Sequence, residues 1–329
     1  MSTAESRSIN YAAAINEALR EEMRRDETVF LMGEDVAAFG GVFKVTEGLQ
    51  AEFGADRVMD TPISEAGIAG LGVGAAMAGS RPVIEIMFGD FLFLAMDQLV
   101  NQAAKVRYMS GGAWGVPLVV RTTLGAGRRT AAQHSQSLHA MLAHFPGLKV
   151  VLPSNAYDAK GLLKSAIRDP DPVLVFEHKL LYRERAIVPL GDYLVPLGVA
   201  NVVRPGADLT ILALARMVSV AVEAATRLAE RNIDAEVIDL RSLAPLDVPT
   251  LVTSVQKTGR CVIVDEGHLS FGATAEIAAI VGHEAFSQLR APIERVAALD
   301  VPVPFSPALE DVAVPDADKV VQAALVVMG

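Results

Sequence analysis

The alternation of short apolar strands with amphipathic helices restricts the fold of this 329-residue chain more than any other feature. Neighbouring parallel strands need a crossover, usually a helix, so this alternation predicts parallel sheets covered by helices. Three prolines, Pro189, Pro196 and Pro205, interrupt the pattern, which then resumes. We therefore predict an α/β protein with two parallel-sheet domains, at residues 1–185 and 206–329, joined by a linker at residues 186–205.

The predicted elements follow from hydrophobic periodicity and capping residues. Asn10 is a suitable N-cap for the first helix, and Ser154 or Asn155 for a later one. Strands are expected at residues 29–32, 58–59, 82–87, 117–122, 150–151, 173–177, 209–213, 235–240, 261–265 and 293–298. Helices are expected at residues 11–25, 65–79, 91–109, 156–168, 217–231, 271–283 and 316–327, with two more starting near Thr46 and Ser135.

The helix after the second strand is unusually rich in small residues. Its sequence, DTPISEAGIAGLGVGAAMAGSR, spans residues 60–81, with Ser64 as the N-cap and Glu65 in the first turn. No charge follows Glu65 until the helix ends, so we expect this helix to be buried on all sides. Small residues four apart form a ridge that a second backbone could approach: Ala66, Gly70, Gly74 and Ala78.

Glu65 has two interpretations on this evidence. An acid in the first turn complements the helix dipole, which contributes about 0.3–1 kcal/mol. A lone carboxyl at the mouth of an apolar helix can also serve to hold or transfer a proton. Spacing alone leaves both open.

Two other patterns are weaker. The G-x-G-x-x-A match at residues 70–75 begins more than a turn into the helix, whereas a dinucleotide fingerprint needs its first glycine at the strand-to-helix turn, so we treat the match as accidental.

His134, His139 and His144 are five residues apart, about 140° on a helix, and cannot converge on a metal. We expect His139 and His144 to be surface or packing residues. His134 follows an open Gly/Arg loop and is a candidate functional residue.

Composition excludes several classes of protein. The formal net charge is −10, which argues against nucleic-acid binding. Cys261, the single cysteine, lies in an apolar run and is expected in a buried strand, so no internal disulfide can form. The N-terminus lacks an apolar signal core, and the longest uncharged stretch, residues 66–80, is too short to span a bilayer. We expect a cytoplasmic protein that neither enters nor crosses a membrane.

Several longer stretches together resemble one family: the β subunit of the E1 component of 2-oxo acid dehydrogenase complexes. They cover most of residues 30–182, with a looser match at VIVDEGHLSFG in the second domain. The matching stretches are GEDVAAFGGVFKVTEGL, RVMDTPISEAGIAGLGVGAAMAG, AMDQLVNQAAK, YMSGG, AAQHSQSLHA, PGLKVVLPSNAYDAKGLLKSAIRDPDPV and FEHKLLY.

The resemblance implies a thiamine diphosphate enzyme of the transketolase-like fold, with a pyrimidine-binding domain and a transketolase C-terminal-like domain. It implies that the carboxyl of Glu65 hydrogen-bonds N1′ of the pyrimidine and favours the imino tautomer of the ring. The imino nitrogen then removes the proton from C2 of the thiazolium. The C2 carbon then attacks a 2-oxo acid, CO₂ leaves, and the acyl group passes to a lipoyl arm. By the same resemblance Met87 and Phe91 lie against the pyrimidine, and His134 faces the mouth of the site.

The segment AIRDPD ends a helix at residues 166–171, where unpaired carbonyls and the helix dipole favour a cation. The resemblance implies a structural potassium ion there. Some family members have an amide in place of Asp171, so that ligand is less secure than the others. The implied ligands are Leu118, Ala166, Ile167, Asp169 and Asp171.

A missing motif predicts the partner. The family's diphosphate motif, GDG followed by Asn, is absent from this chain. The resemblance therefore implies that an α subunit holds the diphosphate through Mg²⁺, in an α₂β₂ heterotetramer that is active only when assembled, and that a lipoyl-bearing E2 acyltransferase accepts the acyl group.

Three alternatives stay open. An acetoin dehydrogenase β subunit looks much the same, and pyruvate, branched-chain 2-oxo acids and acetoin are all possible substrates because the α chain forms much of the substrate pocket. The C-terminal half of a split transketolase usually carries G-x-D-G-P-T-H where this chain has AAQHSQS. A non-catalytic nucleotide-binding or scaffolding protein would tolerate Glu65→Gln without loss of any turnover.

Overall fold

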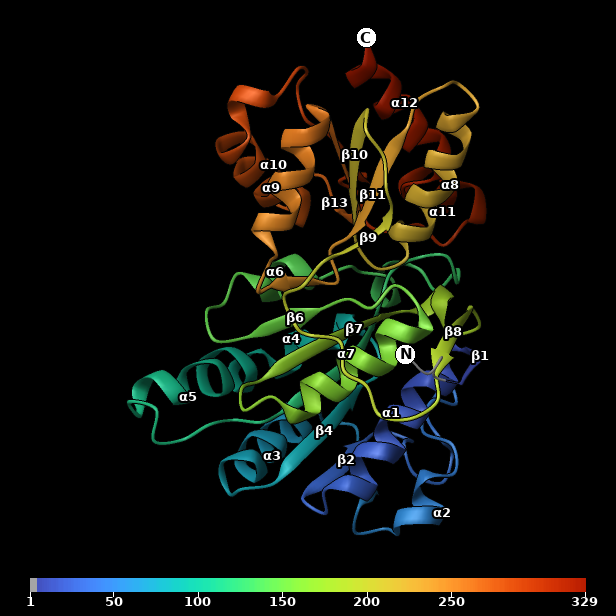
Figure 1. Cartoon of the computed structure of the whole chain (residues 1–329). Helices are drawn as coiled ribbons and strands as arrows, with labels where there is room; N and C mark the ends of the chain where they lie inside the picture. The colour runs from blue at the N-terminus through green and yellow to red at the C-terminus, as the bar shows by residue number, and fades with distance from the viewer. Residues whose placement is uncertain (1–4) are drawn as a thin grey trace. The chain divides into compact units, whose positions relative to one another are not determined.

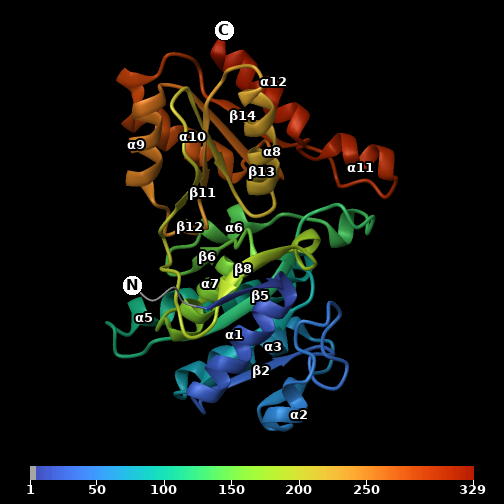
Figure 2. The ribbon, with the colours of Figure 1, turned by 45° about the vertical axis from the view of Figure 1, so that its right-hand side comes forward.

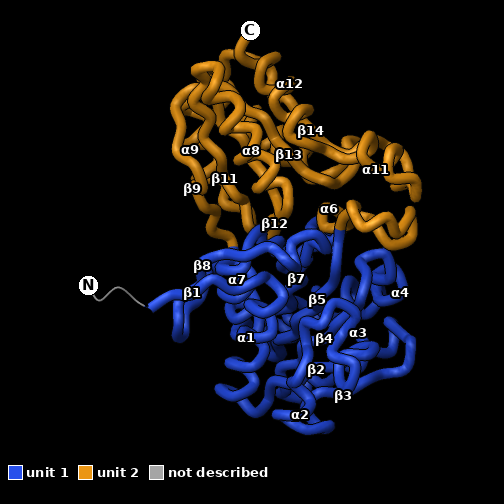
Figure 3. The backbone as a smooth tube through the Cα atoms, turned by 90° about the vertical axis from the view of Figure 1, so that its right-hand side faces the viewer, with its two compact units in different colours: residues 1–124, 142–197 blue, residues 125–141, 198–329 orange. Residues whose placement is uncertain are grey.

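The computed structural model describes residues 5–329, so the first four residues of the predicted first domain lie outside it. The chain forms two units, blue and orange in Figure 3. Unit 1 consists of the chain up to Leu124 together with Leu142–Leu197, and unit 2 of Gly125–Met141 together with Gly198–Gly329. The segment Gly125–Met141 therefore belongs to unit 2, although it precedes the last part of unit 1 in the sequence.

Unit 1 is built on a parallel sheet, as the alternating pattern predicts (Figure 1). Within unit 1 its strands follow the order β6-β7-β5-β4-β2-β3. Most residues of these strands are buried and many are apolar, which is expected for strands covered on both faces. The strands are β2 (Val29–Gly33), β3 (Val58–Asp60), β4 (Arg81–Ile86), β5 (Val119–Leu124), β6 (Lys149–Val151) and β7 (Val173–His178).

The helices of unit 1 begin at the expected caps. Asn10 Oδ1 accepts from Ala13 N at 2.7 Å at the start of α1 (Tyr11–Arg25), and Asn155 Oδ1 accepts from Asp158 N at 2.9 Å at the start of α7 (Ala156–Arg168). The sequence pattern does not predict the antiparallel pair β1 (Ser6–Asn10) and β8 (Arg185–Pro189), whose second strand lies in the expected linker. The remaining elements are α2 (Leu49–Phe53), α3 (Glu65–Met77), η1 (Gly89–Phe91), α4 (Leu92–Met96), the π-helical η2 (Asp97–Ala103), α5 (Ala104–Met109) and η4 (Lys179–Leu181).

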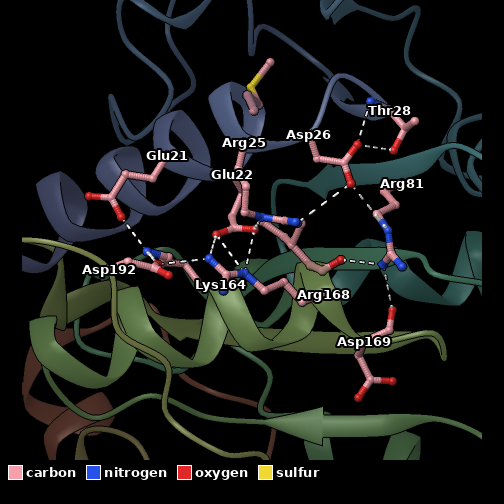
Figure 4. A network of polar contacts seen from close by, with 12 residues as sticks. Glu21, Glu22, Arg25, Asp26, Thr28, Arg81, Lys164, Arg168, Asp169 and Asp192 are labelled. Carbon is pink, nitrogen blue, oxygen red and sulfur yellow. Dashed lines mark hydrogen bonds and ion pairs between the residues drawn. The ribbon is translucent and has the colours of Figure 1, made fainter.

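An ion-pair network joins α1 to α7 (Figure 4). Glu22, which is fully buried on α1, accepts from the guanidinium of Arg168 at 2.7 Å. Lys164, also buried, lies 2.6 Å from Glu21 and pairs with Asp192. Paired charges of this kind avoid the large desolvation penalty of a lone buried ion, so the network fixes the position of α1 on α7.

Unit 2 contains a second sheet with the order β14-β13-β10-β11-β9. Its pairs are parallel except at the edge, where β9 runs antiparallel to β11. Helices α8 and α12 cover one face, and α9 and α10 the other (Figures 1 and 2). Its strands are β9 (Asn201–Arg204), β10 (Leu209–Ala213), β11 (Ala235–Asp239), β13 (Cys261–His268) and β14 (Glu294–Ala298). The short strand β12 (Ser242–Ala244) also belongs to unit 2 but is not part of this sheet. The helices are α8 (Met217–Ala229), α9 (Val248–Thr258), α10 (Ala273–Glu284), η5 (Phe286–Gln288), α11 (Pro307–Ala313) and α12 (Ala317–Met328).

Cys261 is buried at the start of β13, as predicted. Burial raises the pKa of its thiol well above the ordinary value, which keeps the group protonated and unreactive. The sequence pattern missed α9, α11, β9 and β12. Between residues 5 and 329, no helix is both long enough and apolar enough to cross a membrane.

Two expectations are wrong. The helix expected to start near Ser135 starts instead at His139, as α6 (His139–Ala143), after a 3-10 turn, η3 (Ala132–His134). Helix α3 is not buried on all sides, since Leu71 is 65% exposed. Only one side of α3 packs closely: a Cβ on Gly72 would lie 3.0 Å from side-chain atoms of Ile84 and Leu118, whereas one on Gly74 would meet nothing within 4 Å.

Candidate active site

Glu65 begins α3, and the residue is largely buried. Ser64 Oγ caps the helix by accepting from Gly67 N at 3.3 Å. Glu65 is 6% exposed, and within residues 5–329 its carboxylate has no hydrogen bond and no ion pair. Buried polar groups in proteins nearly always have a partner. This side chain is therefore suited to a ligand that brings a hydrogen-bond donor.

A second carboxyl, that of Glu34, lies close enough to Glu65 to interact with its charge. It follows β2 directly and is half-buried. Its burial, and next the negative charge of Glu65, raise the pKa of Glu34 above its ordinary value. Sequence reasoning missed Glu34, although an acid immediately after a parallel strand could have signalled it.

Met87 and Phe91 lie just beyond the end of β4. Thr123 Oγ1 donates to the carbonyl of Met87 at 2.8 Å, which holds this turn against β5. Both side chains are half-buried, so each keeps surface that a ligand can contact, and the ring of Phe91 packs edge-on against Phe88 at 5.7 Å between centroids. Gly89 is required between them, because a Cβ there would lie 2.8 Å from Thr123 O.

The sheet order explains why these groups gather. Strands β4, β2 and β3 are adjacent and parallel, so their carboxyl ends meet at one edge. Glu34 follows β2, Glu65 follows the turn after β3, and Met87 follows β4. Ligands of open α/β sheets bind at such an edge, so the structure brings the two carboxyls and the two predicted pyrimidine contacts together within unit 1.

A buried charge cluster lies on three neighbouring strands of the same sheet. Arg121 on β5 is 1% exposed and donates to Glu85 on β4 at 2.6 Å and to both oxygens of Glu177 on β7 at 2.7 and 2.9 Å. Tyr182 Oη donates to Glu177 at 2.7 Å. Burial works against the charge of Arg121, but Glu177 and Glu85 together raise its pKa above the ordinary value. The cluster ties β4, β5 and β7 together. In the sequence these residues are only isolated charges within apolar strands, so the residue pattern does not predict the cluster.

The histidines have separate positions. His134 is half-buried in η3, in the part of unit 2 that runs from Gly125 to Met141, so it is not in the same unit as Glu65. His139 is fully buried, and its Nε2 lies 2.8 Å from Asp265 Oδ2. His144 is exposed. The expected surface or packing role holds for His144, whereas His139 forms a specific polar pair that spacing could not predict.

The predicted potassium ligands lie together at the end of α7, where the protein's own cations already bind some of them. Arg81 Nη1 donates to the carbonyls of Ile167 and Asp169 at 2.8 and 3.1 Å. Lys149 Nζ lies 2.7 Å from the carboxylate of Asp169 and 3.4 Å from that of Asp171, which also pairs with Arg107. The carbonyls of Leu118 and Ala166 accept from Val173 N and Asp169 N.

Residues 5–329 contain no group of three or more His, Cys, Asp or Glu side chains that could hold a metal. The glycines of the G-x-G-x-x-A match lie inside α3 rather than at a strand-to-helix turn, so the dinucleotide geometry is missing there.

An apolar groove adjoins the first turn of α3. It has a volume of about 540 Å³, and Thr61, Pro62, Gly67 and Leu71 are among its lining residues. Beside it, Ile63 is 82% exposed. Exposed apolar surface of this extent is typical of a face that another protein covers.

Two family profiles match the chain. The family described as "Transketolase, pyrimidine binding domain" matches residues 7–185, and "Transketolase, C-terminal domain" matches residues 198–320.

Full-length relatives carry three different activities in their names. The β subunit of acetoin:2,6-dichlorophenolindophenol oxidoreductase from Bacillus subtilis is 50% identical, over 98% of both chains. The pyruvate dehydrogenase E1 β subunit of Rhizobium meliloti is also 50% identical, over 94% of this chain and 68% of that protein. The 2-oxoisovalerate dehydrogenase β subunit of Bacillus subtilis is 47% identical, over 95% of this chain and 96% of that protein. Identity alone does not separate the three.

Among solved structures, one titled "Split gene transketolase, inactive beta4 tetramer" aligns with a TM-score of 0.79, over 97% of this chain and 98% of that chain. At 24% sequence identity this similarity shows the fold and nothing further.

Proposed function

Because this chain belongs to the family of β subunits of the E1 component of 2-oxo acid dehydrogenase complexes, we propose that it binds the aminopyrimidine end of thiamine diphosphate. Assembled with an α subunit, it would catalyse the oxidative decarboxylation of a 2-oxo acid and transfer the acyl group to a lipoyl-bearing E2 acyltransferase. The observation that carries the proposal is Glu65 itself, a largely buried residue at the carboxyl edge of the sheet whose carboxylate has no hydrogen bond or ion pair to any of residues 5–329.

The residues of this chain would act on the proton and the ring. Thiamine diphosphate, when bound, supplies an acidic carbon that adds to the substrate carbonyl and accepts the electrons released with CO₂. The carboxyl of Glu65 would share a proton with a ring nitrogen, which is most effective where water is excluded. The pKa of Glu34 is raised above its ordinary value by burial and then by the charge of Glu65, so the two carboxyls interact electrostatically. Met87 and Phe91 would orient the ring.

His134 would serve the step in which the acyl group leaves for the lipoyl arm. It is half-buried and follows a Gly/Arg loop, which suits a histidine that exchanges protons with a visiting substrate.

The α subunit is the expected partner for two reasons. This chain has no GDG motif, so the diphosphate end of the cofactor needs another chain. The apolar groove beside α3 and the exposed face of that helix supply surface for it. We propose an α₂β₂ heterotetramer.

A potassium ion at the end of α7 is a further part of the proposal. The carbonyl oxygens of Leu118, Ala166, Ile167 and Asp169 each have two lone pairs, so each can bind an ion beside its present donor. Because Arg81 and Lys149 already supply positive charge, we expect only a small rise in the melting temperature in KCl relative to choline chloride at equal ionic strength. Equal melting temperatures would mean that these two side chains are the only cations there.

The test uses the chain co-expressed with its α subunit and supplied with thiamine diphosphate and Mg²⁺. Pyruvate, 2-oxoisovalerate and acetoin are offered separately, with 2,6-dichlorophenolindophenol as electron acceptor. We expect turnover of a 2-oxo acid. Acetoin as the preferred substrate is the second candidate, favoured by the 50% identity to the acetoin enzyme over 98% of both chains.

The decisive variant is Glu65→Gln, which keeps the size of the side chain but cannot take up a proton. Loss of one proton-transferring group typically lowers the rate by about 10²- to 10⁴-fold. We expect a loss in this range while the α subunit still binds. Unchanged turnover in the assembled variant would refute the proposed role of Glu65 and favour a non-catalytic protein.

A further inference from the structure

The segment Gly125–Met141 is held within unit 2 by three acidic side chains that lie far from it in the sequence. Ala126 N donates to Glu266 Oε1, and Gly127 N donates to Glu310 Oε1. Asp265 holds the other end of the segment through its contact with His139. All three carboxylates are buried, and Glu310 is fully inaccessible to solvent.

Arg129 adds a second connection to Glu310. Its guanidinium lies 2.7 Å from Glu310 Oε2 and 2.8 Å from Asp311, and it donates to the carbonyl of Pro307 at 3.1 Å. Arg129 and Ala131 both have a left-handed backbone, with φ of 57° and 62°. Such conformations persist in non-glycine residues only where surrounding contacts hold them. Glu310 thus binds two points of a strained turn.

Hydrogen bonds inside the segment carry this restraint to His134. Thr130 Oγ1 donates to the carbonyl of His134 at 3.1 Å and lies 3.1 Å from Ser135 Oγ. Gly125 N donates to the carbonyl of Gln136 at 3.4 Å, which closes the loop around them. Glu266 and Glu310 hold one end of the segment, and Asp265 holds the other. His134 lies between these two ends.

We propose that Glu310, with Glu266 and Asp265, is a positioning residue that sets the place of His134. The inference rests on the role proposed above for His134. Burying three carboxylates is unfavourable unless each is hydrogen-bonded. A surface loop of glycine, arginine and threonine does not need such anchors merely to connect two elements, whereas a loop that holds a reacting side chain does.

The first test compares rates in the assembled enzyme. The variants are Glu310→Ala, His134→Gln and the double variant, with Glu310→Gln as the conservative replacement. Glu236→Ala is the matched control, since Glu236 is another buried carboxylate of unit 2 whose partners, Ser254 and Lys257, lie on α9. Two rates are measured: dye reduction, and acylation of a lipoyl domain.

We expect Glu310→Ala to slow acylation of the lipoyl domain by about 10- to 100-fold, the effect of misplacing a reacting group by about 1 Å. His134→Gln should slow the same step, and the double variant should be no slower than His134→Gln alone, because both changes act through one side chain. Glu310→Gln, which can still accept from Gly127 N, should restore most of the rate. Glu236→Ala should leave both rates unchanged. Losses that multiply in the double variant would overturn the inference.

The second test needs no turnover. Amide hydrogen exchange of the intact chain reports on Ala126 and Gly127, whose N–H groups donate to Glu266 and Glu310. We expect Glu310→Ala to speed exchange of the Gly127 amide by about tenfold, with no change in Glu236→Ala. Unchanged exchange in Glu310→Ala overturns the positioning inference itself. Wild-type rates in His134→Gln overturn instead the role proposed for His134, so the two failures are distinguishable.

Discussion

Replacing two glycines of α3, which are two residues apart, by alanine should change the free energy of unfolding in opposite directions. Alanine in a helix is more stable than glycine by about 0.8–1 kcal/mol. At Gly74 a Cβ meets nothing within 4 Å, so Gly74→Ala should gain this full amount. At Gly72 a Cβ would lie 3.0 Å from Ile84 Cγ2 and Leu118 Cδ1, and both side chains are fully buried. Overpacking of this kind costs about 1–3 kcal/mol, so Gly72→Ala should lose up to about 2 kcal/mol net.

The assay is urea unfolding of the isolated chain, followed by circular dichroism, with thermal melts alongside. For a domain of this size, each kcal/mol corresponds to about 2–4 °C in melting temperature. Gly74→Ala should therefore melt above the wild type and Gly72→Ala below it. A stabilising Gly72→Ala, or a destabilising Gly74→Ala, would refute the assignment of the packed and open sides of α3.

The same pair reports on assembly. The open side of α3 carries Gly74 together with exposed apolar residues such as Leu71. If a second backbone approaches this side in the heterotetramer, a methyl group at position 74 obstructs it. We expect Gly74→Ala to weaken assembly measured by analytical ultracentrifugation, although the isolated chain gains stability. Wild-type assembly would mean that no backbone approaches at Gly74.

Three further changes test the packing of unit 1. Arg121→Met leaves Glu85 and Glu177 buried without their cation and should lower the unfolding free energy in urea by about 3–5 kcal/mol; a loss below about 1 kcal/mol would contradict the buried cluster. Asn155→Ala removes the cap of α7 and should cost about 0.5–2 kcal/mol in the same assay, while no loss would mean that the cap contributes nothing. The hydrogen bond from Thr28 Oγ1 is the main cause of a pKa of Asp26 below its ordinary value. This hydrogen bond therefore contributes its full stability above about pH 4, the ordinary pKa of an aspartate, and the contribution is lost as the pH falls through the pKa of Asp26 in the folded state. Thr28→Val should therefore lower the unfolding free energy at pH 7 by about 1 kcal/mol, with a deficit that shrinks towards pH 3; a deficit independent of pH would contradict this.

Much of the fold follows from local signals. Most strands of both sheets fall within a residue or two of the predicted ranges, although β13 extends three residues beyond its expected end. The strands that were not predicted, β1, β8, β9 and β12, are short and lie at edges or outside the main sheets. Asn10 and Ser64 cap their helices as predicted, and Asn155 is the cap of α7 out of the two candidates, Ser154 and Asn155. These features depend on residues within one turn or one strand of each other, so periodicity and capping chemistry describe them.

The candidate site is predictable in part. The position of Glu65 at the start of α3 follows from its sequence context, as does the place of Met87 and Phe91 at and just beyond the end of a predicted strand. Glu34 was missed because its relation to Glu65 depends on β2 and β3 being neighbours, and a sequence of alternating elements does not specify strand order. The uncovered side of α3 was missed for another reason: a helix that is apolar all round gives no sign of which side faces the core.

The sequence by itself determined the order of the elements, the parallel sheets and the acid that opens α3, because local propensity and the need to cover apolar strands act at short range. Only the tertiary structure decided that Arg121 meets Glu85 and Glu177, that the loop bearing His134 belongs to unit 2, and that this loop is held there by Asp265, Glu266 and Glu310. Those pairings join residues from 36 to more than 180 positions apart. Each is set by which strands are adjacent and where a buried charge finds a partner, and hydrophobic periodicity carries no information about either.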